Sequence, residues 1–244
     1  QDYAKAPVNA DTGLEAKERI ITTYQNAGDH DTALSLARDL VKIAPNDRDA
    51  LLALADALRQ KSQFEESAAV ISQVLAAEPQ SADWTLYYLR GTALSEAGHW
   101  PEAEKDLLKA LSLQPDQPDV LNYLGYSWVE KNQRLDQALA MLQKALNAEP
   151  RSGEIADSLG WAYYHIGDYR AAVTNLERAV SFNAVSPEIN DHLGDAYWQV
   201  GRKIEAVYQW RRVLSLAPPA DLKASAEKKL SSGLPAAAAA TAEG

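Results

Sequence analysis

Cysteine is absent from this chain of 244 residues, long apolar runs are absent as well, and basic residues are few. Without cysteine there are no disulfides, no thiolate metal sites and no cysteine nucleophile. No apolar run approaches the ~20 residues that a membrane-spanning helix needs. We therefore expect no direct membrane insertion by this chain. Basic residues are also few, with 24 Lys and Arg against 34 Asp and Glu, for a net charge of −10.

That acidic balance argues against a general nucleic-acid binder or a protein of anionic membrane surfaces, because both need a basic surface. We predict no nucleic-acid partner. The chain begins at Gln1 without Met and without a signal peptide, so we expect a processed product or an excised fragment.

Catalytic motifs are missing as well. The chain has no phosphate-binding Gly loop with Lys, no nucleophile elbow and no paired His at zinc spacing. We predict no catalytic residue, no enzyme activity, no cofactor and no metal site.

What the chain does contain is a repeat of about 34 residues. Gly91, Gly125, Gly160 and Gly194 mark it most plainly, at spacings of 34, 35 and 34 residues. Each unit has an apolar residue before a Gly or Ala, a large residue three positions later, a Gly-led turn, a small residue and a final Pro. A fixed period of this length is typical of stacked supersecondary units.

Each unit is predicted to form two helices. In 153–186, Ile155 and Leu159 begin an apolar stripe at helical spacing, Gly167 ends the first helix, and Leu176 belongs to the second. The small residues are expected where the two helices approach closely, because a large side chain would hold them apart.

The repeats divide the chain into segments. Residues 1–13 are an N-terminal extension or the remnant of a preceding repeat, and 14–230 form the repeat array. An amphipathic helix over 221–230 is expected to cap the last repeat, and 231–244 is a tail without a packing face, expected to be disordered. One extra residue in 131–134 predicts a longer turn or a helix extension there. The six repeats are 14–47, 48–81, 84–117, 118–152, 153–186 and 187–220.

This pattern resembles the tetratricopeptide repeat (TPR) family, most clearly in the last four units. The resemblance implies an all-α fold: a right-handed α-solenoid of six TPR helix pairs plus a C-terminal capping helix. It also implies a non-catalytic scaffold that binds a partner protein or peptide in the concave groove lined by the first helices. The matching small and turn residues are Gly91, Ala103, Ala110, Pro115, Gly125, Ala138, Ala145, Pro150, Gly160, Ala172, Ala179, Gly194, Ala206 and Pro218.

Transferring the family's groove positions to repeats three to six selects a set rich in aromatic and acidic side chains. The set predicts a partner of basic and aromatic or apolar character. The alternative for any single aromatic is packing between neighbouring first helices. Trp128, Tyr163, Tyr197 and Trp210 fall at core positions of the family. The predicted groove residues are Tyr88, Asn122, Tyr123, Tyr126, Asp157, Trp161, Tyr164, His165, Asp191, His192, Asp195 and Trp198.

Two of the four histidines, His165 and His192, fall on first helices of adjacent repeats near Asp191 and Asp195. These residues include metal-ligand types, so a metal site is one interpretation, but ion pairing or groove lining is the favoured one.

The sequences of 121–126, 157–161 and 190–195 are more specific than the general repeat pattern. They look like a bacterial group of long repeat proteins, some of which are envelope lipoproteins that act as adaptors for carboxyl-terminal processing proteases and cell-wall hydrolases. That likeness favours a periplasmic or outer-membrane-anchored adaptor. A cytoplasmic assembly or chaperone-like adaptor, and the non-catalytic TPR part of a larger enzyme, are the alternatives.

Overall fold

The computed structural model is all-helical over the residues that it describes, 10–77, 79 and 83–235. It has thirteen helices there, which confirms the predicted fold class. The chain forms two compact units, Gln1–Pro115 and Asp116–Gly244. None of the helices in the described residues is long and apolar enough to cross a membrane.

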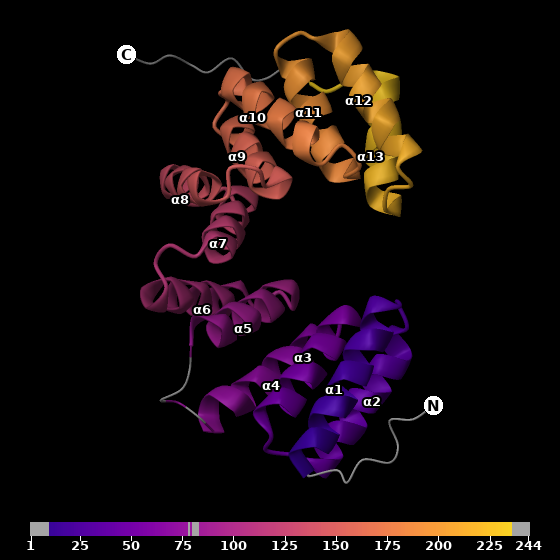
Figure 1. Ribbon diagram of the computed structural model, residues 1–244. Helices are drawn as coiled ribbons and strands as arrows, with labels where there is room; N and C mark the ends of the chain where they lie inside the picture. The colour runs from indigo at the N-terminus through magenta and orange to yellow at the C-terminus, as the bar shows by residue number, and fades with distance from the viewer. Residues whose placement is uncertain (1–9, 78, 80–82, 236–244) are drawn as a thin grey trace. The chain divides into compact units, whose positions relative to one another are not determined.

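The first unit contains three helix pairs (Figure 1). Its core is aliphatic: Ile21, Leu40, Leu58 and Leu86 are buried in one cluster with alanines from two of its helices. Its helices are α1 (Ala10–Asn26), α2 (His30–Ile43), α3 (Arg48–Gln60), α4 (Phe64–Ala77), α5 (Trp84–Glu96) and α6 (Trp100–Leu113).

The second unit contains three further pairs and a last helix, in which consecutive helices pack against each other (Figure 1). Trp128, Tyr197 and Trp210 are buried in it, as predicted, and Tyr163 is half-buried. Its helices are α7 (Pro118–Glu130), α8 (Leu135–Ala148), α9 (Gly153–His165), α10 (Tyr169–Phe182), α11 (Pro187–Gln199), α12 (Lys203–Ser215) and α13 (Ala220–Ser232).

Short turns reverse the chain between the two helices of a pair. Between α9 and α10, Gly167 has φ +85°, a left-handed conformation that glycine adopts without steric cost. Asp168 then caps α10 by accepting a hydrogen bond from the backbone N–H of Ala171. The turn over 131–134 is one residue longer than the others, one of the two outcomes predicted for it.

The marker glycines lie where paired helices touch. A Cβ added at Gly160 would lie 2.6 Å from Leu176 Cγ, and one at Gly194 would lie 2.5 Å from Trp210 Nε1. Both distances are too short for carbon–carbon or carbon–nitrogen contact, so these positions set the spacing of α9 from α10 and of α11 from α12.

The two ends of the array differ from expectation. Helix α1 begins at Ala10, so 10–13 is helical, while 1–9 lies outside the described residues. At the other end, α13 extends to Ser232, and Leu234 packs against the core of the second unit. The predicted tail over 231–244 is therefore wrong for 231–235: Leu234 is apolar surface that the second unit can bury. Residues 236–244 lie outside the described residues.

We predict that Gly160→Leu destabilises the second unit by about 1–3 kcal/mol or more, because the added side chain must displace Leu176 in a packed core. Urea unfolding followed by circular dichroism measures the change. The matched control is Ala140→Leu on the exposed face of α8, which should change stability by less than about 0.5 kcal/mol. Equal midpoints for the two variants would contradict the close contact.

A second prediction concerns Ser62, which has φ +56° in the turn between α3 and α4, where most other pairs have glycine. Ser62→Gly should stabilise the first unit by up to about 1 kcal/mol, because left-handed backbone is costly for a residue with a Cβ. Ser35→Gly within α2 should have the opposite sign, by about 0.5–1 kcal/mol. Urea unfolding of both variants tests this pair, and a loss of stability in Ser62→Gly would contradict it.

Candidate functional site

Eleven of the twelve predicted groove residues lie in the second unit, on the first helices α7, α9 and α11. Tyr88 alone belongs to the first unit, on α5, with its ring centroid 6.2 Å from that of Trp84. On α9 and α11 the predicted residues recur at the same helical spacing. Asp157, Trp161 and Tyr164 on α9 correspond to Asp191, Asp195 and Trp198 on α11. Each set lies on one face of its helix.

The centre of the site is a group of stacked rings, which we call the aromatic ledge: Tyr164, Trp161 and His192. The Tyr164 ring lies 4.6 Å from that of Trp161 at an interplanar angle of 12°, and the His192 ring lies 4.0 Å away at 13°. His165 approaches the same indole edge-on at 5.1 Å. The ledge thus joins two adjacent first helices, α9 and α11, through one indole.

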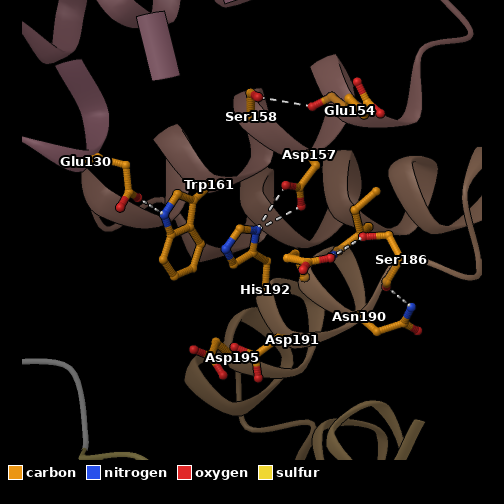
Figure 2. Close-up of polar contacts among 12 residues, drawn as sticks. Glu130, Glu154, Asp157, Ser158, Trp161, Ser186, Asn190, Asp191, His192 and Asp195 are labelled. Atoms are coloured by element: carbon orange, nitrogen blue, oxygen red, sulfur yellow. Dashed lines mark hydrogen bonds and ion pairs between the residues drawn. The ribbon is translucent and has the colours of Figure 1, made fainter. Parts of the chain in front are cut away.

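Carboxylates hold two of these rings in place (Figure 2). Trp161 Nε1 donates a hydrogen bond to Glu130 Oε1 at 2.7 Å, which ties the ledge to α7. His192 Nδ1 lies 3.0 Å from both oxygens of Asp157, and Figure 2 shows the imidazole edge directed at that carboxylate. The rings are therefore oriented before any partner arrives.

Burial and nearby charges act in opposite directions on His192. Burial alone would lower its pKa, but Asp157, with Asp191 and Asp195, outweighs burial and raises the pKa above that of an ordinary histidine. Burial lowers the pKa of His165. His192 therefore keeps its proton to higher pH than a free histidine does, and a protonated imidazole on the Trp161 face gains a cation–π attraction.

Two tyrosines of the site, Tyr126 and Tyr164, stay neutral. Burial, together with Glu130 and Asp157, raises the pKa of Tyr126 well above its usual range. Burial also raises the pKa of Tyr164. Both side chains therefore offer a hydroxyl group and an apolar ring to their surroundings at physiological pH.

Lys229 of α13 neutralises a second group of acids. Its Nζ lies 2.6 Å from Asp191 Oδ2 and 2.8 Å from Asp195 Oδ2, and all three side chains are largely shielded from water. Trp210 Nε1 donates to the other oxygen of Asp195 at 2.9 Å. Burial raises the pKa of Asp195, and Lys229 works against that rise. We expected these acids to face a basic partner, but they pair with a lysine of the same chain.

The third part of the site is Trp198, at the end of α11. Its Nε1 donates to the carbonyl oxygen of Leu234 at 2.8 Å, and Lys203 Nζ lies 3.7 Å from the centre of its ring. Gln199 Nε2 lies 3.3 Å from Tyr164 Oη and 3.3 Å from the carbonyl oxygen of Pro235. Trp198 is thus covered by the segment that follows α13.

The remaining predicted residues are on α7. Tyr123 is half-buried, and the side-chain oxygen of Asn122 is buried without a hydrogen-bond partner among the described residues. Within those residues no group of three His, Asp or Glu side chains is arranged to hold a metal ion. His165 and His192 both contact the Trp161 ring, and His192 also pairs with Asp157.

Sequence reasoning missed Lys229 and Leu234. A signal for Lys229 was available, because Trp161, Asp195 and Lys229 follow one another at intervals of 34 residues. Continuing the repeat register into α13 places Lys229 at the position equivalent to Asp195. Leu234 carried no such signal, since 231–244 is composed mainly of Ala, Ser, Gly and Pro.

Comparison with known proteins identifies the repeat. Two family models described as tetratricopeptide repeat match residues 26–87 and 88–154, and one described as TPR repeat matches 160–201.

Curated relatives are longer than this chain. A TPR repeat-containing protein from Pseudomonas aeruginosa is 31% identical over 113 residues, which is 46% of this chain and 19% of that protein. Protein O-mannosyl-transferase TMTC1 from Mus musculus is 27% identical over 135 residues, which is 54% of this chain and 14% of that protein. The chain spans less than a fifth of the length of each of these relatives.

Solved structures share the fold at low sequence identity. The Cut9–Hcn1 hetero-tetramer of APC/C has a TM-score of 0.79 at 16% identity, over 91% of this chain and 43% of that one. A tetratricopeptide repeat protein from Parabacteroides merdae has a TM-score of 0.70 at 15% identity, over 89% and 85%. YrrB, described as a TPR protein with an unusual peptide-binding site, has a TM-score of 0.55 at 19% identity, over 79% and 97%.

These structures show that the fold is an α-solenoid of TPR helix pairs. The three matched stretches follow one another through both units of the chain. The chain therefore belongs to the tetratricopeptide repeat family.

Proposed function

We propose that this chain is a non-catalytic scaffold that binds a segment of a partner protein on the first helices of its second unit, with the aromatic ledge as the main contact. The observation that carries the proposal is the half-buried Trp161, whose ring is fixed by Tyr164, His192 and Glu130. A large aromatic ring that is oriented in advance loses little conformational freedom on binding, and such rings are frequent binding hot spots.

The chemistry around the ledge favours a partner with apolar or aromatic side chains and a basic group. Tyr164 and His192 stack on the indole, so Trp161 offers a partner its apolar ring edge and the half-buried Tyr164 offers further aromatic surface. Glu130 is exposed beside the indole, so a Lys or Arg of the partner can approach it without losing much hydration. The proposed contact set is Tyr123, Tyr126, Asp157, Trp161, Tyr164, His165 and His192, with Asn122 at its edge and Asp191, Asp195 and Trp198 where α13 packs.

A finer proposal is that the chain is an adaptor of the bacterial envelope that presents substrates to a carboxyl-terminal processing protease. Its support is the likeness of 118–216 to such adaptors and the similarity to a Pseudomonas aeruginosa TPR protein. Fractionation of cells that produce the full-length protein, followed by affinity purification of the periplasmic fraction, tests it. Recovery from the cytoplasm without any protease would favour a cytoplasmic assembly or chaperone-like adaptor.

The second candidate is that the chain is the non-catalytic TPR part of a larger enzyme. It is supported by the similarity to a stretch that makes up 14% of a mannosyl-transferase. The full-length coding sequence discriminates between the two, because an appended catalytic domain would favour this candidate.

We predict that peptides selected from a displayed random library on the immobilised chain bind the ledge. Trp161→Ala should weaken them by about 2 kcal/mol or more, roughly thirtyfold in Kd, because truncating an aromatic anchor removes most of the contact. Isothermal titration calorimetry measures the change.

The matched control is Tyr208→Ala, which removes an exposed aromatic ring on α12 outside the proposed surface. It should leave the Kd within about twofold of the parent value, because a residue outside the contact should change the affinity by no more than the error of the measurement. If Trp161→Ala binds the selected peptides as tightly as the Tyr208→Ala control, the ledge is not the binding surface.

A further inference from the structure

We propose that Trp198 and Gln199 form a subsite that reads the backbone of an extended peptide, and that the chain's own residues 233–235 fill this subsite in place of a partner. The inference rests on the proposed function, since it extends the same groove from α9 to the end of α11. It names the chemistry of the partner segment: a small residue, an apolar residue and then proline.

The contacts to the chain's own segment are those of peptide recognition. The indole N–H of Trp198 donates to the carbonyl of Leu234, and the amide of Gln199 donates to the carbonyl of Pro235. Two side chains from successive positions of one helix thus hold two successive backbone carbonyls. Hydrogen bonds to main-chain carbonyls give affinity for an extended segment of varied sequence.

The side chains of the segment explain which residues fit. Gly233 has φ +68° and lies against the Trp198 ring so closely that an added Cβ would overlap it. Leu234 packs with the hydrophobic cluster of α10, α11 and α12. Pro235 has no backbone N–H, so it leaves no donor unpaired in the groove. A partner segment that fills the subsite in the same way brings a residue without bulk, an apolar side chain and a proline in that order.

The subsite continues into the aromatic ledge. Gln199 Nε2 lies within 3.3 Å of Tyr164 Oη as well as of the Pro235 carbonyl, and Tyr164 stacks on Trp161. A partner segment that replaces 233–235 can therefore run from Trp198 towards the ledge. Its residue beyond the proline reaches the ledge, where the apolar and basic preferences of the proposed function apply.

The buried acids of α11 favour some charges on a partner segment over others. Lys229 bonds one oxygen of Asp191, and the other oxygen, Oδ1, is buried without a hydrogen-bond partner among the described residues. Asp195 lies three residues before Trp198 on α11, and Asp191 and Asp195 share the single Lys229, so this group of charges disfavours an acidic partner segment. The partner segment is therefore neutral or basic.

Competition between the internal segment and an added peptide tests the inference on the full chain. The probe is a synthetic peptide with the sequence of residues 229–235, blocked at both ends and labelled for fluorescence polarisation. Gly233→Val expels the internal segment, because its side chain collides with Trp198. Ser231→Val, at an exposed position of α13 two residues before Gly233, is the matched control.

We expect the peptide to bind Gly233→Val about tenfold more tightly than it binds the parent or the control, because a tethered competitor acts at about millimolar effective concentration. Adding Trp198→Phe to Gly233→Val keeps a ring but removes the N–H donor, and should abolish the gain. Equal binding to parent and Gly233→Val, or a gain that survives Trp198→Phe, would overturn the inference. Should Gly233→Val fold poorly by circular dichroism, Leu234→Gly removes the apolar anchor without that collision and has the same expected outcome.

The library-selected peptides separate this inference from the proposed function. Suppose that Trp161→Ala weakens binding of the selected peptides, while Gly233→Val binds the labelled probe no more tightly than the parent does. Then only the proposed Trp198 subsite is wrong. If the probe behaves as expected while Trp161→Ala has no effect, the ledge is wrong and the subsite stands.

Discussion

The second unit depends on the pairing of carboxylates that its first helices bury. Asp157, Asp191 and Asp195 are each at least nine-tenths buried, and an unpaired carboxylate so placed would cost several kcal/mol. Each acid pairs with a side chain of the helix that follows in the same register: His192 on α11 for Asp157, and Lys229 on α13 for the other two. Because these partners come from neighbouring elements of the stack, the charges also hold those elements in register.

The same pairs set the character of the groove. Asp157 positions the imidazole that stacks on Trp161, and Asp195 accepts from the buried indole of Trp210. Because Lys229 and His192 already pair with these acids, a cation of the partner gains less at α11 than it would beside an unpaired carboxylate. Affinity then comes from aromatic surface and from hydrogen-bond donors that meet backbone carbonyls. An acidic chain can therefore bind a partner segment that is not highly charged.

The fold was predictable because its determinants are local and periodic. Gly160 and Gly194 recur at the closest helix contacts, and four of the six turns within the described helix pairs carry a glycine in left-handed conformation, so one sequence suffices to place the helices. Ion pairing of His192 was one of the two favoured interpretations, but Asp157 as its partner and Lys229 as the partner of Asp191 and Asp195 were not predicted. Spacing shows which face a carboxylate shares but not which side chain of another helix reaches it. The path of 233–235 was unpredictable for another reason: a Gly-Leu-Pro run has no periodicity, and its place depends on the exposed end of α11. Tyr88 belongs to the first unit, and its place in the groove set stays a prediction.

The titration of His192 tests the account most directly, because that residue joins a buried acid to the aromatic ledge. The raised pKa means that protonation of His192 stabilises the folded unit below the pKa of the unfolded chain, and that this contribution is lost as pH rises through the folded pKa. The imidazole shifts of His192, followed by NMR against pH, should give a midpoint above the ordinary value of about 6.5, and Asp157→Asn should lower it. A midpoint at or below that value, unmoved by Asp157→Asn, would contradict the pairing on which the site is built.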